Sequence, residues 1–149
     1  MTACTAFAQT SRGTILIVDD DDLVRSAMMR VLRRTGYEVT DVTTGRDALA
    51  LLHGGADFDL VIADITLPDL DGMSLFTRVL ELEPDRVPRF VFTTRIQRAS
   101  DSRFWSSCAS HVLLKPFHTN ELVECVRDRL LPPPNFIEQT YARTARRER

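Results

Sequence analysis

The stretch that decides the fold is DFDLVIAD at residues 57–64, in which an apolar run from Leu60 to Ala63 ends directly at Asp64. A run this short, bounded by polar residues, is typical of a β-strand that is buried on both faces of a sheet. The chain holds four more such runs, rich in β-branched and aromatic residues, and we expect all five to be strands. The other four lie at residues 15–18, 37–42, 90–92 and 112–114.

Segments with helical spacing separate the expected strands. The first spans residues 23–34 and is followed by Gly36, a residue type that often caps the C-terminal end of a helix. Thr44 and Thr119 are expected to cap the helices that follow them. A weaker, serine-rich segment at residues 99–109 is the expected fourth helix. The apolar stripes of the other helices are Val24, Met28, Val31 and Leu32; Ala48, Leu49 and Leu52; Leu75, Phe76, Val79 and Leu80; and Leu122, Val123, Val126 and Leu130.

Strands and helices alternate along the chain, and this alternation predicts the fold class. Short apolar strands between helices favour an α/β fold: a doubly wound, five-stranded parallel sheet with helices on both faces. We expect the flavodoxin-like strand order 2-1-3-4-5. Residues 14–131 are the expected domain, and residues 1–13 a flexible N-terminal tail. Residues 132–149 form a tail that starts with prolines, is rich in arginine and is too short for a DNA-binding domain.

The composition narrows the class of protein. The 149 residues fit one domain, and a net charge of −2 is too balanced to favour nucleic acid as the main partner. No apolar run is long enough to cross a membrane and the N-terminus lacks the features of a signal peptide, so we expect a cytoplasmic protein. The three cysteines, Cys4, Cys108 and Cys125, are widely spaced and are expected to be reduced thiols.

Polar side chains follow the expected strands, at the edge where a doubly wound sheet binds its ligands. Asp19 and Asp20 follow the first strand, and Asp64 follows the third. Thr93 ends the fourth strand and Lys115 the fifth. Lys115 is the only lysine among 19 basic residues, so an arginine-rich composition does not explain it. Because these groups lie on successive strand ends, we interpret them as one site.

Other acids near this site have simpler explanations. Asp21 and Asp22 suit the start of a helix, where a negative charge is favourable, and Asp69 and Asp71 are placed to cap a turn. Each member of the predicted site also has an ordinary structural explanation when it is taken alone. The set as a whole is what points to a function.

The predicted site gathers three carboxylates, and their charge indicates its chemistry. Carboxylates about 5 Å apart repel by roughly 3 kcal/mol per pair at an effective dielectric near 20. Lys115 can neutralise one charge, and Mg²⁺, which prefers oxygen ligands, can neutralise the rest. A metal ion and an ammonium group around a carboxylate nucleophile are what phosphoryl transfer requires. The pattern therefore predicts phosphoryl transfer to one of these carboxylates, with the Thr93 hydroxyl donating to a phosphoryl oxygen.

Five stretches of the chain, in their order and spacing, resemble those of bacterial two-component response-regulator receiver domains of the single-domain type that chemotaxis regulators represent. The resemblance covers the expected domain, residues 14–131. The stretches are residues 15–20, DFDLVIAD at 57–64, LPDLDG at 67–72, Phe92-Thr93, and LKPF at 114–117.

The resemblance implies how the acids act. Asp64 corresponds to the aspartate that is phosphorylated. Asp20, Asp64 and the backbone carbonyl of Thr66 correspond to ligands of Mg²⁺. Asp19 corresponds to an acid that contacts the metal through water.

The resemblance also implies the switch residues. Thr93 corresponds to the switch hydroxyl and Lys115 to the lysine that pairs with the phosphoryl group, with a cis bond to Pro116. Receivers often carry an aromatic residue three positions before this lysine, but here the residue is Val112, so the resemblance does not extend to aromatic gating at this position. Phe104 and Trp105, in the expected fourth helix, either fill the core or offer an anchor to a partner.

The function implied is that of a phospho-acceptor response regulator in a two-component or phosphorelay pathway. A histidine kinase or a histidine phosphotransfer protein would donate to Asp64 with the help of Mg²⁺. Output would pass by protein contact through the face of the fourth helix, fifth strand and fifth helix. It would reach either a downstream target or a second copy in a homodimer, with no direct contact to nucleic acid or membrane.

Three alternatives stay open. The chain could be a receiver cut from a hybrid histidine kinase or from a DNA-binding regulator. A Mg²⁺-dependent phosphatase is disfavoured, because Thr66 stands where such enzymes carry a second acid. A phosphate-independent interaction module is disfavoured by the intact set of acids, hydroxyl and lysine. We therefore expect a switch, and not an enzyme that acts on an external substrate.

Overall fold

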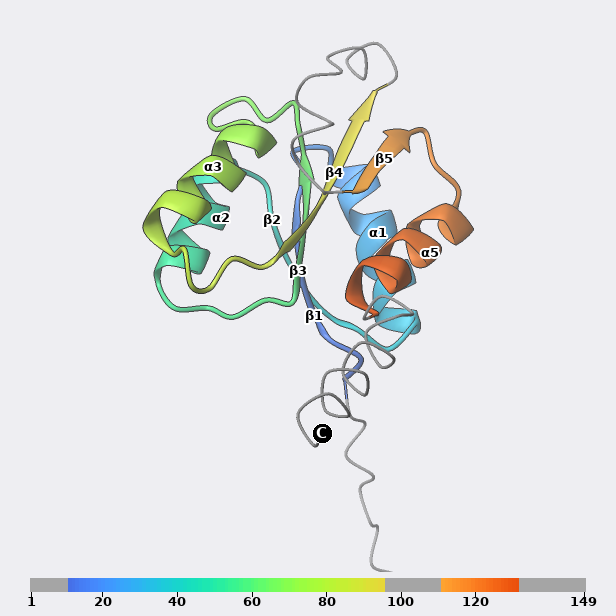
Figure 1. Cartoon of the computed structure of the whole chain (residues 1–149). Coiled ribbons are helices and arrows are strands. Elements are labelled where there is room, and N and C mark those ends of the chain that lie inside the picture. The colour runs from blue at the N-terminus through green and yellow to red at the C-terminus, as the bar shows by residue number, and fades with distance from the viewer. Residues whose placement is uncertain (1–10, 96–110, 132–149) are drawn as a thin grey trace, which may run out of the picture.

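The computed structural model describes residues 11–95 and 111–131, which form one parallel sheet of order β2-β1-β3-β4-β5 (Figure 1). The expected fold class and strand order are confirmed. The strands are β1 (Thr14–Val18), β2 (Glu38–Val42), β3 (Leu60–Asp64), β4 (Arg89–Arg95) and β5 (His111–Lys115). The described helices are α1 (Asp22–Arg34), α2 (Gly45–His53), α3 (Gly72–Leu82) and α5 (Thr119–Leu130). The helix expected at 99–109, with Phe104 and Trp105, lies outside the described residues, as do residues 1–10 and 132–149.

The central strand β3 explains why the sheet is covered on both sides. All five of its residues are buried, as the apolar run that precedes Asp64 predicts. Leu60 and Ile62 pack into a core with side chains of α1 and α5, whereas Val61 and Ala63 pack into a second core with side chains of α2 and α3. Figure 1 shows these two helix layers on opposite faces of the sheet.

The ends of α1 and α2 follow from local sequence. The Asp21 carboxylate accepts hydrogen bonds from the first backbone N–H groups of α1 and so satisfies donors that the helix itself cannot pair. At the other end, Gly36 has a positive φ of 102°, and the N–H groups of Gly36 and Tyr37 donate to carbonyls of the last turn. This is the glycine cap that the sequence predicts. Thr44 caps α2, also as predicted, by accepting from the Asp47 N–H.

Two local expectations are wrong. Thr119 does not cap α5: the backbone is still extended at His118, whose N–H donates to Glu121 Oε2 at 3.1 Å, so Thr119 is already the first helical residue. Leu80 is 43% exposed, although it was expected in the buried stripe of α3. The buried stripe of α3 is narrower than predicted, because Leu75 and Val79 are buried and Phe76 packs partly buried against Phe90 and Phe92 of β4, without Leu80.

The described helices are all too short or too polar to cross a membrane. The carboxyl ends of the parallel strands meet at one edge of the sheet, and this edge carries the residues of the predicted site.

Candidate functional site

Three carboxylates cluster where β1 and β3 end. Because β1 and β3 pair in register from Ile15 with Leu60 to Val18 with Ala63, the next residues on the two strands, Asp19 and Asp64, are neighbours. Asp19, Asp20 and Asp64 each offer an oxygen, and these oxygens all lie within 4.8 Å of one another. Asp19 is completely buried and Asp64 is 7% exposed, whereas Asp20 is exposed. The crowding expected from the sequence is therefore present.

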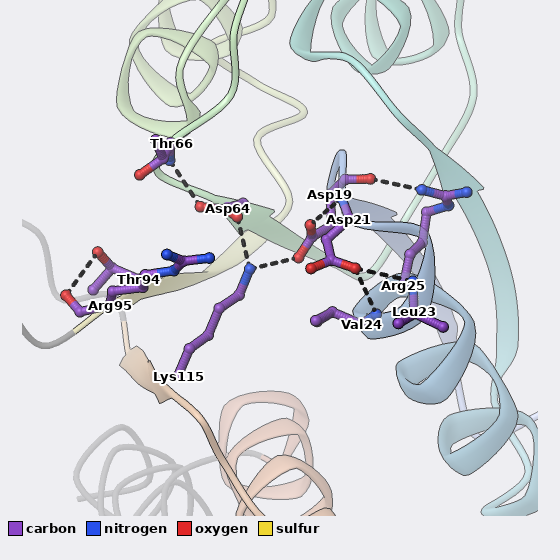
Figure 2. A network of polar contacts seen from close by, with 10 residues as sticks. All are labelled: Asp19, Asp21, Leu23, Val24, Arg25, Asp64, Thr66, Thr94, Arg95 and Lys115. Carbon is purple, nitrogen blue, oxygen red and sulfur yellow. Dashed lines mark hydrogen bonds and ion pairs between the residues drawn. The ribbon is translucent and has the colours of Figure 1, made fainter.

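Lys115 bridges the two buried acids. Its Nζ lies 2.9 Å from Asp19 Oδ2 and 2.7 Å from Asp64 Oδ2, and Figure 2 shows the ammonium group between the two carboxylates. Since β4 separates β5 from β3 in the sheet, only a long side chain at the end of β5 can reach Asp64. The bond between Lys115 and Pro116 is cis, as the resemblance implies.

Each buried acid also accepts a hydrogen bond from a backbone N–H group close by in the chain. The Asp21 N–H donates to Asp19 Oδ1 at 2.9 Å, and the Thr66 N–H donates to Asp64 Oδ1 at 2.8 Å. Within the described residues, by contrast, no hydrogen bond reaches the Asp20 carboxylate. Asp20 is thus the acid most open to a ligand from solvent.

Burial and ion pairing have opposite effects on the pKa values of the groups in the cluster. Burial raises the pKa of Asp19 above its usual value, because the loss of hydration outweighs the hydrogen bonds from Lys115 and Asp21. Burial acting alone would lower the pKa of Lys115, but the hydrogen bonds to Asp64 and Asp19 outweigh it, so the pKa of Lys115 is raised. Three carboxylates face one ammonium group, and the excess negative charge suits a divalent cation.

A buried hydroxyl completes the site. Thr93 on β4 pairs in register with Asp64 and is fully buried. Among the residues that the structure describes, Thr93 Oγ1 is the buried side-chain atom without a hydrogen-bond partner. Such an unpaired group costs about 1–3 kcal/mol, so its place beside Asp64 needs a reason. A hydroxyl that gains an acceptor only when a phosphoryl oxygen arrives would supply one.

The other acids near the site are structural, as the sequence suggests. Asp71 caps α3 by accepting from the Ser74 N–H. Asp69 instead reaches α2, where its carboxylate accepts from the N–H groups of Gly45 and Arg46. Although partial burial opposes it, these backbone hydrogen bonds lower the pKa of Asp69 below its usual value.

Two features were not foreseen from the sequence. One is Arg25 on α1, which donates to the backbone carbonyl of Asp19 and pairs with Asp41 of β2. No local pattern points to this contact, since it joins segments far apart in the chain. The other is a cavity of about 540 Å³ beside Lys115. Its described lining is Asp21, Val24, Ala27, Arg95, Lys115, Pro116 and Phe117.

Comparison with known proteins places this geometry in a family. Residues 15–127 match the response regulator receiver domain. The response regulator receiver protein CpdR of Brucella abortus (strain 2308) is 32% identical over 117 residues, which cover 78% of this chain and 96% of CpdR. The sensor kinase CckA of the same strain is 30% identical over 120 residues, which are 79% of this chain but 12% of the kinase. The chain thus spans only a small part of some curated relatives.

A solved structure supports the comparison at the site itself. The receiver domain of the sensor histidine kinase PA1611 from Pseudomonas aeruginosa PAO1 was solved with a magnesium ion coordinated in its active-site cleft. It is 26% identical, with a TM-score of 0.70, and the match covers 79% of this chain and 97% of that one. With its parallel sheet, its acid cluster and a match over most of its length, the chain belongs to the family of response regulator receiver domains.

Proposed function

We propose that Asp64 of this receiver accepts a phosphoryl group from a phosphohistidine donor. The observation that carries the proposal is that Asp64 pairs with a neutralising ammonium group 2.7 Å away and has an oxygen within 4.8 Å of oxygens of two further carboxylates. A carboxylate oxygen of Asp64 attacks the phosphorus atom, the P–O bond forms, and the P–N bond to the donor histidine breaks with its electron pair returning to the imidazole. Receivers are signalling switches rather than enzymes with an external substrate, so the phosphatase alternative is set aside.

The acid cluster fits a magnesium ion. Asp20 and Asp64 would hold it together with the backbone carbonyl of Thr66, and Asp19 would contact it through water. When bound, the ion neutralises charge on the phosphoryl oxygens during transfer. In support, the three carboxylates lie within 4.8 Å, and the PA1611 receiver holds magnesium in its active-site cleft.

Thr93 and Lys115 would respond to the new charge. A phosphoryl group on Asp64 offers oxygen acceptors to the unpaired Thr93 hydroxyl and to the Lys115 ammonium group. Thr93 lies on β4 and Lys115 ends β5, the strand that precedes α5. We propose that output passes through the face of the expected fourth helix, β5 and α5, to a downstream protein or to a second copy of the chain.

Membership of the family implies interaction with a histidine kinase as phosphodonor. We further propose that a histidine phosphotransfer protein can take the donor role, and that the protein works in the cytoplasm, where ATP-dependent kinases act. The donor must approach Asp64 from solvent, at the edge of the sheet where the carboxyl ends of the strands meet. Two features near the acid cluster could contact the donor. One is the 540 Å³ cavity beside Lys115, and the other is Leu23 of α1, an apolar side chain that is 84% exposed. The alternative is that the chain is one domain of a hybrid histidine kinase or of a DNA-binding regulator, and the reading frame beyond Arg149 tests this.

Phosphorylation is tested with acetyl phosphate and Mg²⁺ on the purified chain. We expect one phosphoryl group per molecule by mass spectrometry, and loss of all labelling in Asp64→Asn. Asp69→Asn is the matched control, since Asp69 lies five residues on in the same loop and points to α2. Beryllofluoride should shift amide signals of the wild type, including those around Thr93, but not those of Asp64→Asn. Labelling that persists in Asp64→Asn would overturn the proposal.

We expect slow self-dephosphorylation, with a lifetime of minutes or longer. Thr66 and Arg95 stand two residues beyond Asp64 and Thr93, and neither is an acid or amide that would readily orient a hydrolytic water. The decay of the phosphorylated protein, followed by mass after removal of the donor, measures this lifetime. Thr66→Asn should shorten it, and a wild-type half-life of a few seconds would contradict the expectation.

A further inference from the structure

Arg25 connects three segments beside the acid cluster. Its side chain is only 12% exposed. Nη1 donates to the backbone carbonyl of Asp19 at 3.0 Å, and Figure 2 shows this contact. Nε donates to Asp41 Oδ2 at 2.8 Å, and Nη2 donates to Asp22. One guanidinium group therefore ties the loop after β1 to β2 and to the first turn of α1.

These contacts matter because of what holds Asp20. Its carboxylate is exposed and receives no hydrogen bond within the described residues, yet it must keep its place if it is to ligate a metal. Both peptide groups that flank Asp20 are anchored. The carbonyl before it accepts from Arg25, and the N–H after it, that of Asp21, donates to Asp19 Oδ1. Since peptide groups are planar, anchoring one atom of each limits the rotation of both planes and so the direction of the Asp20 side chain.

We propose that Arg25 is a positioning residue of the metal site, which acts through the Asp19–Asp20 peptide to hold the Asp20 carboxylate. This inference rests on the proposed function, because it presumes that Asp20 ligates Mg²⁺. Arginine suits the role, since its planar guanidinium offers five N–H donors in a fixed fork. The single ammonium group of a lysine could not meet the Asp19 carbonyl, Asp22 and Asp41 in the same geometry.

The direction in which the Mg²⁺ affinity changes in Arg25 variants distinguishes a positioning role from an effect of charge alone. A cation beside the cluster repels Mg²⁺, so if charge alone mattered, Arg25→Gln would bind Mg²⁺ more tightly and Arg25→Lys would bind it equally well. Positioning predicts the opposite. Both variants lose the set of three contacts that fixes the Asp19 carbonyl, and both should bind Mg²⁺ about tenfold more weakly, as is usual when residues that orient metal ligands are removed.

The test is calorimetric titration of the unphosphorylated full chain with Mg²⁺, which needs no activity. Arg30→Gln is the matched control: it removes an exposed arginine from the same helix and should leave the dissociation constant unchanged. Asp41→Asn removes one anchor of the guanidinium but keeps the Asp19 contact, so it should weaken binding by a smaller factor. The amide signals of residues 20 and 21 should broaden or shift in the Arg25 variants before any metal is added.

The outcomes are distinct. Unchanged or tighter Mg²⁺ binding in Arg25→Lys and Arg25→Gln, with the wild type binding normally, overturns the inference and leaves the proposed function intact. A wild type that binds no Mg²⁺ overturns both. If the Arg25 variants do not fold, the answer comes from Asp41→Asn, where an unchanged dissociation constant overturns the inference.

Discussion

Lys115→Met is expected to lower the free energy of unfolding by about 3–5 kcal/mol at neutral pH without Mg²⁺, as the loss of one partner of a buried ion pair usually does. Among the described residues, the Lys115 ammonium group is the only cation that pairs with the side-chain carboxylates of Asp19 and Asp64. Without it, two buried carboxylates keep only their backbone hydrogen bonds. Urea unfolding of the two proteins at pH 7 measures the loss, and methionine keeps much of the aliphatic volume.

The pH dependence of this loss has a definite sign. The pKa of Lys115 is raised above 10.5, so its contribution to stability is fully present below that pH and disappears as the pH rises through the folded-state pKa. The pKa of Asp19 is raised by burial even with Lys115 present, and removing the lysine raises it further. An acid with a raised folded-state pKa binds protons more readily when folded, so Lys115→Met should gain stability as the pH falls below 7. The two stability curves should therefore converge at acidic and at strongly alkaline pH.

Two controls make this prediction specific. The double variant Asp64→Asn, Lys115→Met lacks one of the two carboxylates that lose their ammonium partner in Lys115→Met. Part of the lost free energy of unfolding should therefore return. Arg78→Met, which removes an exposed cation from α3, should change stability little. A loss of less than about 1 kcal/mol in Lys115→Met, which is the size expected of a solvated pair, would show that the cluster is far better hydrated than its burial indicates.

The position of the acid cluster was predictable from the sequence because it depends only on which segments are strands and on the order of those strands in the sheet. Short apolar runs identify parallel strands, and the carboxyl ends of parallel strands meet at one edge. Acids at the ends of β1 and β3 must then be neighbours whenever the two strands are adjacent. The same logic placed Thr93 next to Asp64 and the lone lysine close enough to reach it.

The features that the sequence did not predict depend on contacts between segments that lie far apart in the chain. Arg25 is one of many arginines, and only the packing of α1 against the end of β2 brings it to Asp41 and the Asp19 carbonyl. The missing partner of the Thr93 hydroxyl is likewise a property of its surroundings in space. The wrong prediction of a cap at Thr119 has a local cause. The backbone N–H of His118 donates a hydrogen bond to the Glu121 side chain, so the helix starts one residue earlier than residue-type preferences predict.

Asp20→Asn is expected to abolish Mg²⁺ binding and yet to stabilise the metal-free protein. The Asp20 oxygen lies within 4.8 Å of oxygens of Asp19 and Asp64, so neutralising it removes two repulsions. Because Asp20 is exposed and partly screened, the gain should be about 1 kcal/mol, or a rise of about 3 °C in Tm for a domain of this size. The gain should shrink as salt is added. Asp21→Asn is the matched control, since asparagine caps a helix about as well as aspartate.

Mg²⁺ should reverse this order of stability. The ion stabilises the wild type by binding only its folded state, by about 1.4 kcal/mol when its concentration is ten times the dissociation constant. Asp20→Asn gains nothing from the ion, so its melting temperature should exceed that of the wild type without Mg²⁺ and fall below it with saturating Mg²⁺. Thermal melts across a Mg²⁺ series locate the crossing point. A variant that is less stable than the wild type in the absence of metal would mean that Asp20 makes a favourable contact, and the crowded carboxylates would then not explain why this site takes a cation.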